Sequence, residues 1–332
     1  MSRYFLGLDI GSTKTHACVA DETGQVIGFG GAGGGNHESV GYEGMIHALG
    51  AATREALTNA RIATRALDGA GFGIAGFDWH TERAAMLDAI SSLKLEAPLE
   101  IVNDAMLGVI AGAREGWGVA VVSGTGCNAR GRTRDGKREG MVTGAGTRMG
   151  EGAGASELMQ WTVQVLSHQW SKRGPVTQLA DAMIERAGAR NLEDLLEGLI
   201  NFRYELDASA APIVFQIASQ GDLVAQKLIE RAGRELGELA NAVIRQLDFQ
   251  NETFDVVLVG SMFNSGKVLI RPMRETILPL APNARLTRLK APPVVGAILL
   301  AMEQARLAPT SAIRERLQAT LRFAPRAAIP AQ

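Results

Sequence analysis

The sequence predicts an α/β protein of two similar domains, and three observations support this prediction. The chain has 332 residues, and at about 100–200 residues per domain this length favours two domains. Short apolar strands alternate with helical segments, and the 39 glycines cluster in turns without a fixed period, as in α/β proteins with ligand-binding loops. An apolar strand, a glycine-containing turn and a second strand also occur twice, with turns that begin at Gly11 and Gly124, which predicts an internal duplication.

The composition limits the classes of partner. Lys and Arg number 34 and Asp and Glu number 35, which gives a net charge of −1, and this balance provides no basic surface for nucleic acid or an acidic membrane. The two cysteines, Cys18 and Cys127, are too few for a disulfide framework and favour a reducing compartment. No apolar run approaches the roughly 18–20 residues that span a bilayer. We therefore expect a cytoplasmic protein without membrane or nucleic-acid partners.

The first domain is expected at residues 1–117 and begins with three strands. A glycine-rich loop at 30–37 follows the third strand, and helices and strands then alternate. The expected strands are 6–10, 15–20, 25–30, 69–78 and 99–105, and the expected helices are 42–59, 81–93 and 105–114.

The second domain is expected at residues 118–291 and begins with the repeated strand pair at 118–131. An apolar helix at 292–306 follows it, and residues 308–332 are rich in Pro, Ala and Arg, so we expect a flexible, loosely packed tail. The other expected elements are a strand at 254–260 and helices at 151–171, 175–187, 192–200, 212–220, 222–247 and 265–277.

The first turn has the chemistry of an anion site. Gly11, Ser12 and Thr13 offer backbone N–H groups and two hydroxyls, and such turns bind phosphate without a P-loop. A plain tight turn would carry the same residues. Asp9, at the end of the preceding strand, distinguishes the two interpretations, because a carboxylate would repel phosphate unless Mg²⁺ lay between them. The pattern therefore predicts a magnesium–phosphate site.

The second turn repeats this chemistry. Ser123, Gly124, Thr125 and Gly126 again place hydroxyls and glycine N–H groups after an apolar strand. Taken alone, this could also be a structural turn. Two such turns facing each other would bind the β- and γ-phosphates of one nucleotide.

Asp104 is the candidate catalytic residue. It stands in "VNDA", where a strand ends and a helix begins, which is the usual place for a functional residue at a sheet edge. Asp is also a good helix N-cap, so the sequence leaves both roles open. As a base, Asp104 would take the proton from an attacking hydroxyl group.

Two glycine-containing segments have weaker signals. "GSMFNSGKV" at 260–268 is similar to a P-loop but has one residue too many between its glycines, and Val268 replaces the required Ser or Thr. Because it follows a strand and opens a helix, we expect it to face a nucleoside. The loop at 30–35 is either a flexible linker or a means of bringing the amide of Asn36 to a small ligand.

Taken in order, these segments resemble the actin/hexokinase/Hsp70 superfamily. Within it the chain is similar to the BadF/BadG/BcrA/BcrD-type ATPases, whose sugar-kinase branch includes N-acetylglucosamine kinase. The resemblance covers 4–304 and implies two ribonuclease H-like (actin-like ATPase) domains with a cleft between them, the helix 292–306 crossing back to complete the first. The segments that carry it are "GLDIGSTKTHACVAD", "GNH", "VNDA", "VVSGTG" with Asn128, "VLVGSMFNS" and "APPVVGAILLA".

The resemblance also implies roles for individual residues. Asp104 would be catalytic and Asp9 would hold the metal, while Ala210 and Ala211 would lie near the adenine. The residues expected to bind ATP are Gly11, Ser12, Thr13, Lys14, Ser123, Gly124, Thr125, Gly126, Gly260, Ser261 and Ser265. The residues expected to bind the substrate are Asn36, His37, Asp78, Asn128, Gly144 and Glu151.

The chain departs from the kinase pattern after the second turn. Ala145 stands where the N-acetylglucosamine kinases carry tryptophan, and Glu151 stands where they carry a sugar-binding aspartate. A side chain longer by one methylene implies a different pocket. Trp79 is a candidate for the missing aromatic wall.

The resemblance implies an ATP- and Mg²⁺-dependent kinase that phosphorylates a hydroxyl of an amino sugar, with N-acetylglucosamine or a related hexosamine as first choice, acting as a homodimer. The alternative is an ATPase that acts as a conformational motor and activates a partner enzyme. Such activators hold an iron–sulfur cluster between subunits, and neither Cys18 nor Cys127 is expected to reach a partner. A sugar sensor would normally add a helix-turn-helix, and the chain begins directly with the first strand.

Overall fold

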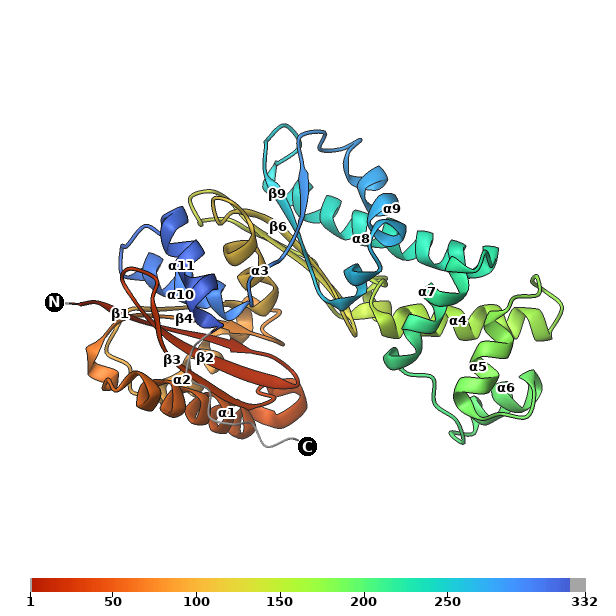
Figure 1. Ribbon diagram of the computed structural model, residues 1–332, viewed down its shortest axis with the longest axis horizontal. Coiled ribbons are helices and arrows are strands. Elements are labelled where there is room, and N and C mark those ends of the chain that lie inside the picture. Colours follow the sequence, from red (N-terminus) through yellow and green to blue (C-terminus); the bar gives the residue numbers. More distant parts are fainter. Residues whose placement is uncertain (1, 323–332) are drawn as a thin grey trace.

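The computed structural model describes residues 2–322. The first of its two β-sheets is formed by strands from the N-terminal part of the chain (Figure 1). The strand order is β3-β2-β1-β4-β5. The first three strands form antiparallel hairpins, and β4 and β5 add in parallel beside β1. The strands are β1 (Tyr4–Ile10), β2 (Lys14–Asp21), β3 (Val26–Gly33), β4 (Leu67–Ile74) and β5 (Leu99–Asn103).

The second sheet repeats this topology. Read from β8, its order is β8-β7-β6-β9-β10, with antiparallel pairs between β6, β7 and β8 and parallel pairs between β6, β9 and β10. The β6–β7 hairpin thus occupies the place that the β1–β2 hairpin has in the first sheet, which confirms the internal duplication. The strands are β6 (Gly118–Ser123), β7 (Cys127–Arg132), β8 (Glu139–Met141), β9 (Asp255–Val259) and β10 (Arg285–Arg288).

Two helices cross between the sheets. The helix α3 (Asp104–Gly112) follows β5 of the first sheet and packs against β6, β7 and β9 of the second, whereas α10 (Val294–Gln304) follows the second sheet and packs on β1 and β4. The contact requires glycine, because a Cβ at Gly7 would lie 2.5 Å from the backbone nitrogen of Ile298. The crossing of the last helix to the first sheet agrees with the expectation from the resemblance.

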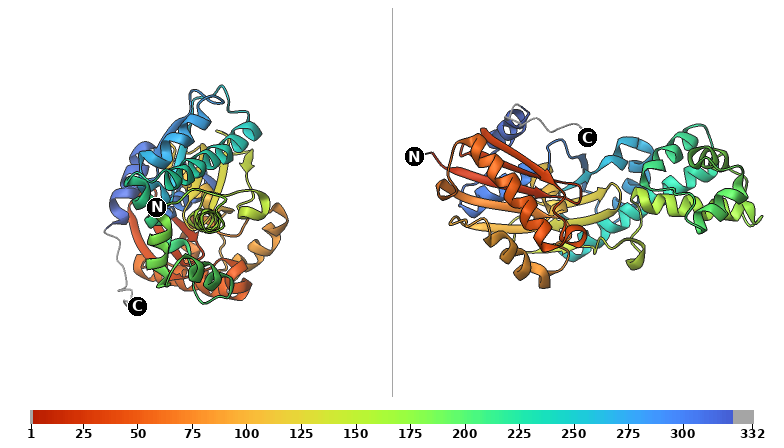
Figure 2. Two further views of the ribbon diagram at one scale, coloured as in Figure 1. Left: turned by 90° about the vertical axis from the view of Figure 1, so that its right-hand side faces the viewer. Right: turned by 90° about the horizontal axis from the view of Figure 1, so that it is seen from below.

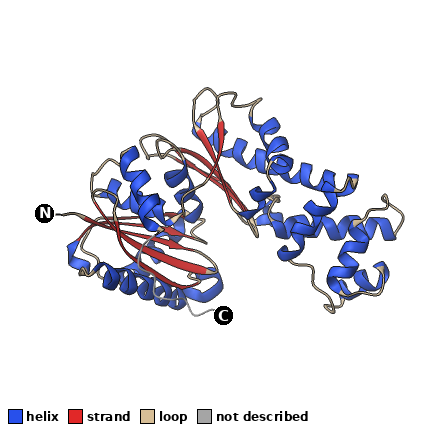
Figure 3. Ribbon diagram, in the orientation of Figure 1, coloured by secondary structure: helices blue, strands red, loops and turns tan. Residues whose placement is uncertain are grey.

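Helices cover the outer faces of both sheets (Figure 3). The first sheet is covered by α1 (His37–Ala60), with α2 (Arg83–Ser91) beside it. The second sheet continues into a helical extension, which projects away from the sheets (Figures 1 and 2). Of the helices of the second domain, α8 (Leu223–Leu247) packs on β6, β7 and β8, and α9 (Lys267–Ile277) packs on α8. The others are α4 (Ala155–Trp170), α5 (Leu179–Ala187), α6 (Leu192–Ile200) and α7 (Ala211–Ser219). Short 3₁₀ turns lie at Thr64–Ala66, His80–Glu82, Gly146–Met149, Ala208–Ala210 and Ser261–Ser265.

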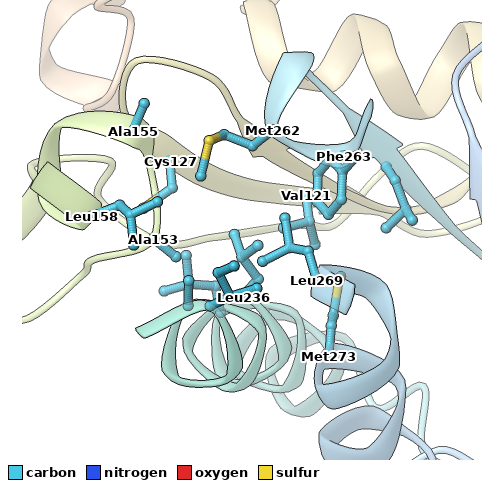
Figure 4. Close-up of a cluster of buried hydrophobic side chains, with 14 of the residues drawn as sticks. Val121, Cys127, Ala153, Ala155, Leu158, Leu236, Met262, Phe263, Leu269 and Met273 are labelled. Atoms are coloured by element: carbon cyan, nitrogen blue, oxygen red, sulfur yellow. The ribbon is translucent and has the colours of Figure 1, made fainter. Parts of the chain in front are cut away.

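The second domain has one continuous apolar core. Val121 and Cys127 of the β6–β7 hairpin, Leu158 of α4, Leu236 of α8 and Phe263 are all buried in it (Figure 4). This core fixes the second turn relative to the helical extension. Within residues 2–322, no helix is long and apolar enough to cross a bilayer.

The structure corrects three expectations about local structure. The short strands β8 and β10 were missed. The strand β3 continues to Gly33, so most of the glycine-rich segment is strand and not a flexible linker. The tail that we expected to be loose contains α11 (Ser311–Leu321), in which Leu317 and Leu321 are buried and the Thr320 hydroxyl accepts a hydrogen bond from the N–H of Val26. Residues 323–332 of the expected tail lie outside the described residues.

Candidate active site

The first turn, between β1 and β2, is held from behind by the segment that follows β3. The N–H of Gly35 donates to the Gly11 carbonyl over 2.9 Å, and a Cβ at Gly34 would lie 2.0 Å from the Ser12 carbonyl oxygen. The side chains of Ser12 and Thr13 are exposed on the other side. The glycines thus allow two backbone segments to touch, and the turn keeps its hydroxyls available to a ligand.

Asp9 lies half-buried beside this turn, and within residues 2–322 no donor is hydrogen-bonded to its carboxylate. Burial, followed by repulsion from Asp104, raises its pKa to about 7, and the charge of Lys14 opposes this rise. A nearby cation would remove this penalty, so the carboxylate fits a Mg²⁺ ligand. The described part of the chain holds no group of three or more His, Cys, Asp or Glu that could form a metal site, and Mg²⁺ commonly binds one or two carboxylates together with water and phosphate.

The structure separates the two roles that the sequence left open for Asp104. Asn103 is the N-cap of α3, and its Oδ1 accepts a hydrogen bond from the N–H of Ala105 over 3.0 Å. Asp104 is the first residue of the helix, and its Oδ1 accepts from the same N–H over 2.8 Å. Burial raises the pKa of Asp104 to about 6; the N–H of Ala105 and the charge of Arg130 lower it, and repulsion from Asp78 raises it. The cap role falls to Asn103, which leaves Asp104 with a raised pKa suited to a base.

The second turn is fixed by the start of α4. The carbonyls of Gly124 and Thr125 accept hydrogen bonds from the N–H groups of Ala155 and Ser156 over 2.8 and 2.9 Å. Thr125 and Gly126 are exposed. Ser123 corrects our expectation, because it is fully buried and its hydroxyl donates to the Ala153 carbonyl over 2.7 Å. Its side chain supports the turn and is not available to bind ATP.

The end of β9 lies directly against the second turn. Gly260 has φ +108°, and a Cβ there would lie 2.2 Å from the Ser123 carbonyl oxygen, so only glycine fits. Ser261 is exposed next to it. The hydroxyl of Ser265 is already used, since it donates to the Met262 carbonyl over 2.7 Å. Of the expected nucleoside segment, the structure therefore leaves the side chain of Ser261 available.

The expectation for the adenine is wrong for two residues. Ala210 and Ala211 are each 1% exposed and belong to the apolar core of the second domain. They therefore do not face a ligand site.

Asn36 and His37 lie where β3 leads into α1. Asn36 caps α1, with its Oδ1 accepting from the N–H of Glu38 over 2.9 Å, and its Nδ2 donates to the Ser12 hydroxyl over 3.2 Å. His37 stacks on Tyr42, and its Nδ1 is buried without a partner among the described residues. Asn36 thus contacts the first turn, and His37 follows it as the first residue of α1.

The second domain contributes Asn128, Gly144 and Glu151. Gly144 packs on the side chain of Asn128, since a Cβ there would lie 3.0 Å from Nδ2. The Oε1 of Glu151 accepts hydrogen bonds from the N–H and the hydroxyl of Thr143 over 2.7 and 2.9 Å. The Oδ1 of Asn128 and the Oε2 of Glu151 are buried with no partner in the part of the chain that the structure describes. Two acceptors without donors suit the hydroxyl or amide groups of a sugar.

Sequence analysis missed Arg130 and Thr143. Arg130, on β7 two residues after Asn128, donates through Nη2 to the Oδ1 of Asp78 over 2.8 Å. The sequence does contain an indication of the role of Arg130, because a charged side chain in an otherwise buried strand needs a partner. Thr143 gave no signal, because its role depends on how the following loop folds. Trp79, the candidate aromatic wall, is 47% exposed.

One cavity lies between the two domains, and neither of the two turns lines it. This cavity, of about 740 Å³, is lined from both sides, by Asp78, Trp79 and Asn103 of the first domain and by Arg130 and Glu139 of the second. Cys18 and Cys127 are both buried, so neither is placed to share a cluster with a partner subunit.

Comparison with known proteins agrees with this geometry. An N-acetylmuramic acid/N-acetylglucosamine kinase of Clostridium acetobutylicum is 25% identical over 91% of this chain and 99% of its own. An N-acetyl-D-glucosamine kinase of Dictyostelium discoideum is 26% identical over 90% of this chain and 97% of its own.

Solved structures show the same fold. A candidate N-acetylglucosamine kinase from Chromobacterium violaceum matches with a TM-score of 0.66 at 23% identity, covering 90% of this chain and 98% of its own. A ROK family glucokinase from Streptomyces griseus, solved with glucose and AMPPNP, matches with a TM-score of 0.56 at 17% identity, covering 91% and 100%. These structures have the actin-like ATPase fold.

The model of one protein family matches residues 6–301. This range includes both turns, Asp104 and the crossing helix α10 up to residue 301. The chain therefore belongs to the BadF/BadG/BcrA/BcrD ATPase family.

Proposed function

We propose that the protein is an ATP-dependent kinase that phosphorylates a hydroxyl group of an amino sugar, N-acetylglucosamine or a related hexosamine. The observation that carries the proposal is the Asp104 carboxylate, which begins α3 directly after the N-cap Asn103 and has a raised pKa. Two full-length relatives that are named as amino-sugar kinases support the substrate class. The compartment that fits this role is the cytoplasm, where ATP is available.

The residues of the first turn fit Mg²⁺ and ATP. Asp9 would hold the metal, and the exposed N–H and hydroxyl groups of Ser12, Thr13 and Thr125 would bind the phosphates. When bound, Mg²⁺–ATP supplies the phosphoryl group and neutralises its charge. The protein's task is then to position the acceptor and to receive its proton.

Asp104 would receive that proton. With a pKa of about 6, its carboxylate is mostly ionised at neutral pH and is more basic than an ordinary Asp. As the sugar hydroxyl attacks, its proton would pass to Asp104 and its oxygen would form the new bond to the γ-phosphorus, while the bond from that phosphorus to the β-phosphate oxygen breaks and ADP leaves. Phosphoryl transfer depends mainly on positioning and charge neutralisation, so a single base of this kind is sufficient.

The second domain would bind the sugar from the opposite side. The unpartnered Oδ1 of Asn128 and Oε2 of Glu151 would accept hydrogen bonds from sugar hydroxyl or amide groups. Asn36, tied to Ser12, would approach the sugar next to the first turn. The sugar would thus bridge the two domains and exclude water from the phosphoryl group.

An ADP-release assay with glucose, glucosamine, N-acetylglucosamine and N-acetylmuramic acid tests the proposal. We expect sugar-dependent turnover that requires Mg²⁺ and is highest with an N-acetylated sugar. Phosphorylated sugar, detected by mass spectrometry, should form in a 1:1 ratio to ADP. Hydrolysis of ATP at one rate with and without every sugar would contradict the kinase and favour the motor.

A further inference from the structure

We propose that Arg130, in the second domain, is a positioning residue that holds Asp78 and Asn103 and thereby fixes the first turn of α3, where Asp104 stands. The proposal rests on the proposed function, because it takes Asp104 as the base. It assigns to Arg130 a part in the chemistry although its side chain is only 3% exposed. Because its side chain is buried, we expect Arg130 to affect the reaction through the residues that it contacts and not by binding the substrate.

The contacts form a continuous chain from one domain to the other. The Nη2 of Arg130 donates to the Oδ1 of Asp78 over 2.8 Å, and the Nδ2 of Asn103 donates to the same oxygen over 3.0 Å. Asn103 also donates to the Phe77 carbonyl over 3.1 Å, and its Oδ1 accepts from the N–H of Ala105. The side chain that caps α3 is therefore oriented by an oxygen that Arg130 holds.

Asp78 depends on Arg130 for its charge balance. Glu38 and Glu82 lie close enough to repel its carboxylate, and Arg130 is the cation that opposes them. Arg130 also faces Glu139 at 3.8 Å and the sulfur of Met141 at 3.1 Å. Without the guanidinium, the Asp78 carboxylate would stand among like charges. Either the loop that carries Asp78 would move, or the carboxylate would take up a proton.

Through these contacts, the position of Asp104 depends on how the two domains pack against each other. Arg130 belongs to β7, whereas Asp78 and Asn103 belong to the first domain. The pair is intact only when β7 and the segment after β4 are in contact. Asp104 is thus fixed at the start of α3 when the domain carrying Asn128 and Glu151 is seated against it.

Arg132 provides a matched control. It lies two residues farther along β7 and also pairs across the domains, through bonds of 2.9 and 2.8 Å to Glu303 of α10. It donates to the Gly116 carbonyl as well. Loss of Arg132 therefore removes a comparable interdomain ion pair that has no connection to Asn103.

The experiment compares R130Q, R130K and R132Q in the sugar-phosphorylation assay. We expect R130Q to lower kcat about 10–100-fold, as misplacement of a reacting group does, with the KM values for sugar and ATP within about 3-fold of wild type. R130K should recover part of kcat, and R132Q should keep it. Equal kcat losses in R130Q and R132Q, or a loss confined to KM, would overturn the proposal.

A double-mutant cycle keeps this test separate from the proposed function. The thermal midpoints of D78N, R130Q and D78N/R130Q should be non-additive, with the double variant losing less than the sum of the two single losses. Additive losses would overturn the pairing even if the wild type phosphorylates no sugar, a result that would by itself refute only the kinase. If R130Q does not fold, R130K and D78N carry the comparison.

Discussion

The two domains share a topology but not a chemistry. Each has a five-stranded sheet in the same order and a turn after its first strand. In the first domain Asp9 precedes the turn by two residues, and at the corresponding position in the second domain, two before Gly124, stands Val122. The helices that cross between the sheets also differ at their first residue, which is Asp104 in α3 and Val294 in α10. The two domains thus share a backbone topology, but only the first has an aspartate at these two positions.

This difference gives the two domains different roles in the proposed kinase. The first domain supplies the groups whose charge changes, namely Asp9 and Asp104, whereas the second supplies neutral turn donors and the acceptors Asn128 and Glu151. Changes in the first domain should therefore affect kcat and pH dependence. Changes to the acceptors Asn128 and Glu151 of the second domain should affect binding, whereas Arg130 should affect kcat through its contact with Asp78 of the first domain.

The largest effect is expected for Asp104→Asn. The amide keeps the size of the side chain but cannot take a proton, so kcat should fall about 10²–10⁴-fold, while the Kd for Mg²⁺–ATP stays within 2-fold. Steady-state kinetics and isothermal titration calorimetry measure the two quantities. Asp88→Asn, on the exposed face of α2, is the matched control. Undiminished turnover in Asp104→Asn would place the base elsewhere.

The second test is a substitution that shifts the second turn without changing a charged residue. Gly260→Ala would place a Cβ 2.2 Å from the Ser123 carbonyl oxygen at φ +108°, so the turn must shift. We expect nucleotide affinity to fall about 10-fold and stability to fall by about 1–3 kcal/mol. Gly136→Ala, at φ +67° with nothing within 4 Å, isolates the backbone strain. Equal nucleotide Kd values in the two variants would show that the end of β9 is not part of the ATP site.

The third test concerns pH. The pKa values of Asp9 and Asp104 are raised to about 7 and about 6, so the folded protein holds these protons more tightly than the unfolded chain. The resulting stabilisation is complete below about pH 4 and is lost as the pH rises through 6 and 7. Asp9→Asn should therefore stabilise the ligand-free protein at pH 8 by about 1–3 kcal/mol, after allowance for solvent screening, and leave it unchanged at pH 4.

Denaturant unfolding at the two pH values measures this effect. The same variant should lose most of its Mg²⁺-dependent activity, so stability and function change in opposite directions. A loss of stability at pH 8 would show that the Asp9 carboxylate has a favourable partner in the ligand-free protein.

Local pattern predicted the repeated hairpins and the helix at 292–306, whereas the crossing of this helix to the first sheet was implied by the family resemblance. Gly11 and Gly124 follow apolar strands, and this is visible along the chain. The missed strand β10 has only partly buried residues, so no apolar pattern indicated it. The roles of Ser123 and Ser265 were also beyond reach, since each hydroxyl is used by a carbonyl whose position depends on packing. Arg130 and Asp78 lie 52 residues apart, and only the fold brings them together.

The smallest effect is expected at the sugar-facing side of the second domain. Glu151→Asp shortens the side chain by one methylene, so it cannot keep both bonds to Thr143 and still present its second oxygen at the same place. We expect KM for the sugar to change about 3–10-fold, to different extents for glucosamine and N-acetylglucosamine, with kcat nearly unchanged. Glu193→Asp, exposed at the start of α6, is the control. A fall in kcat at constant KM would mean that Glu151 itself acts in the chemical step and not in binding the sugar.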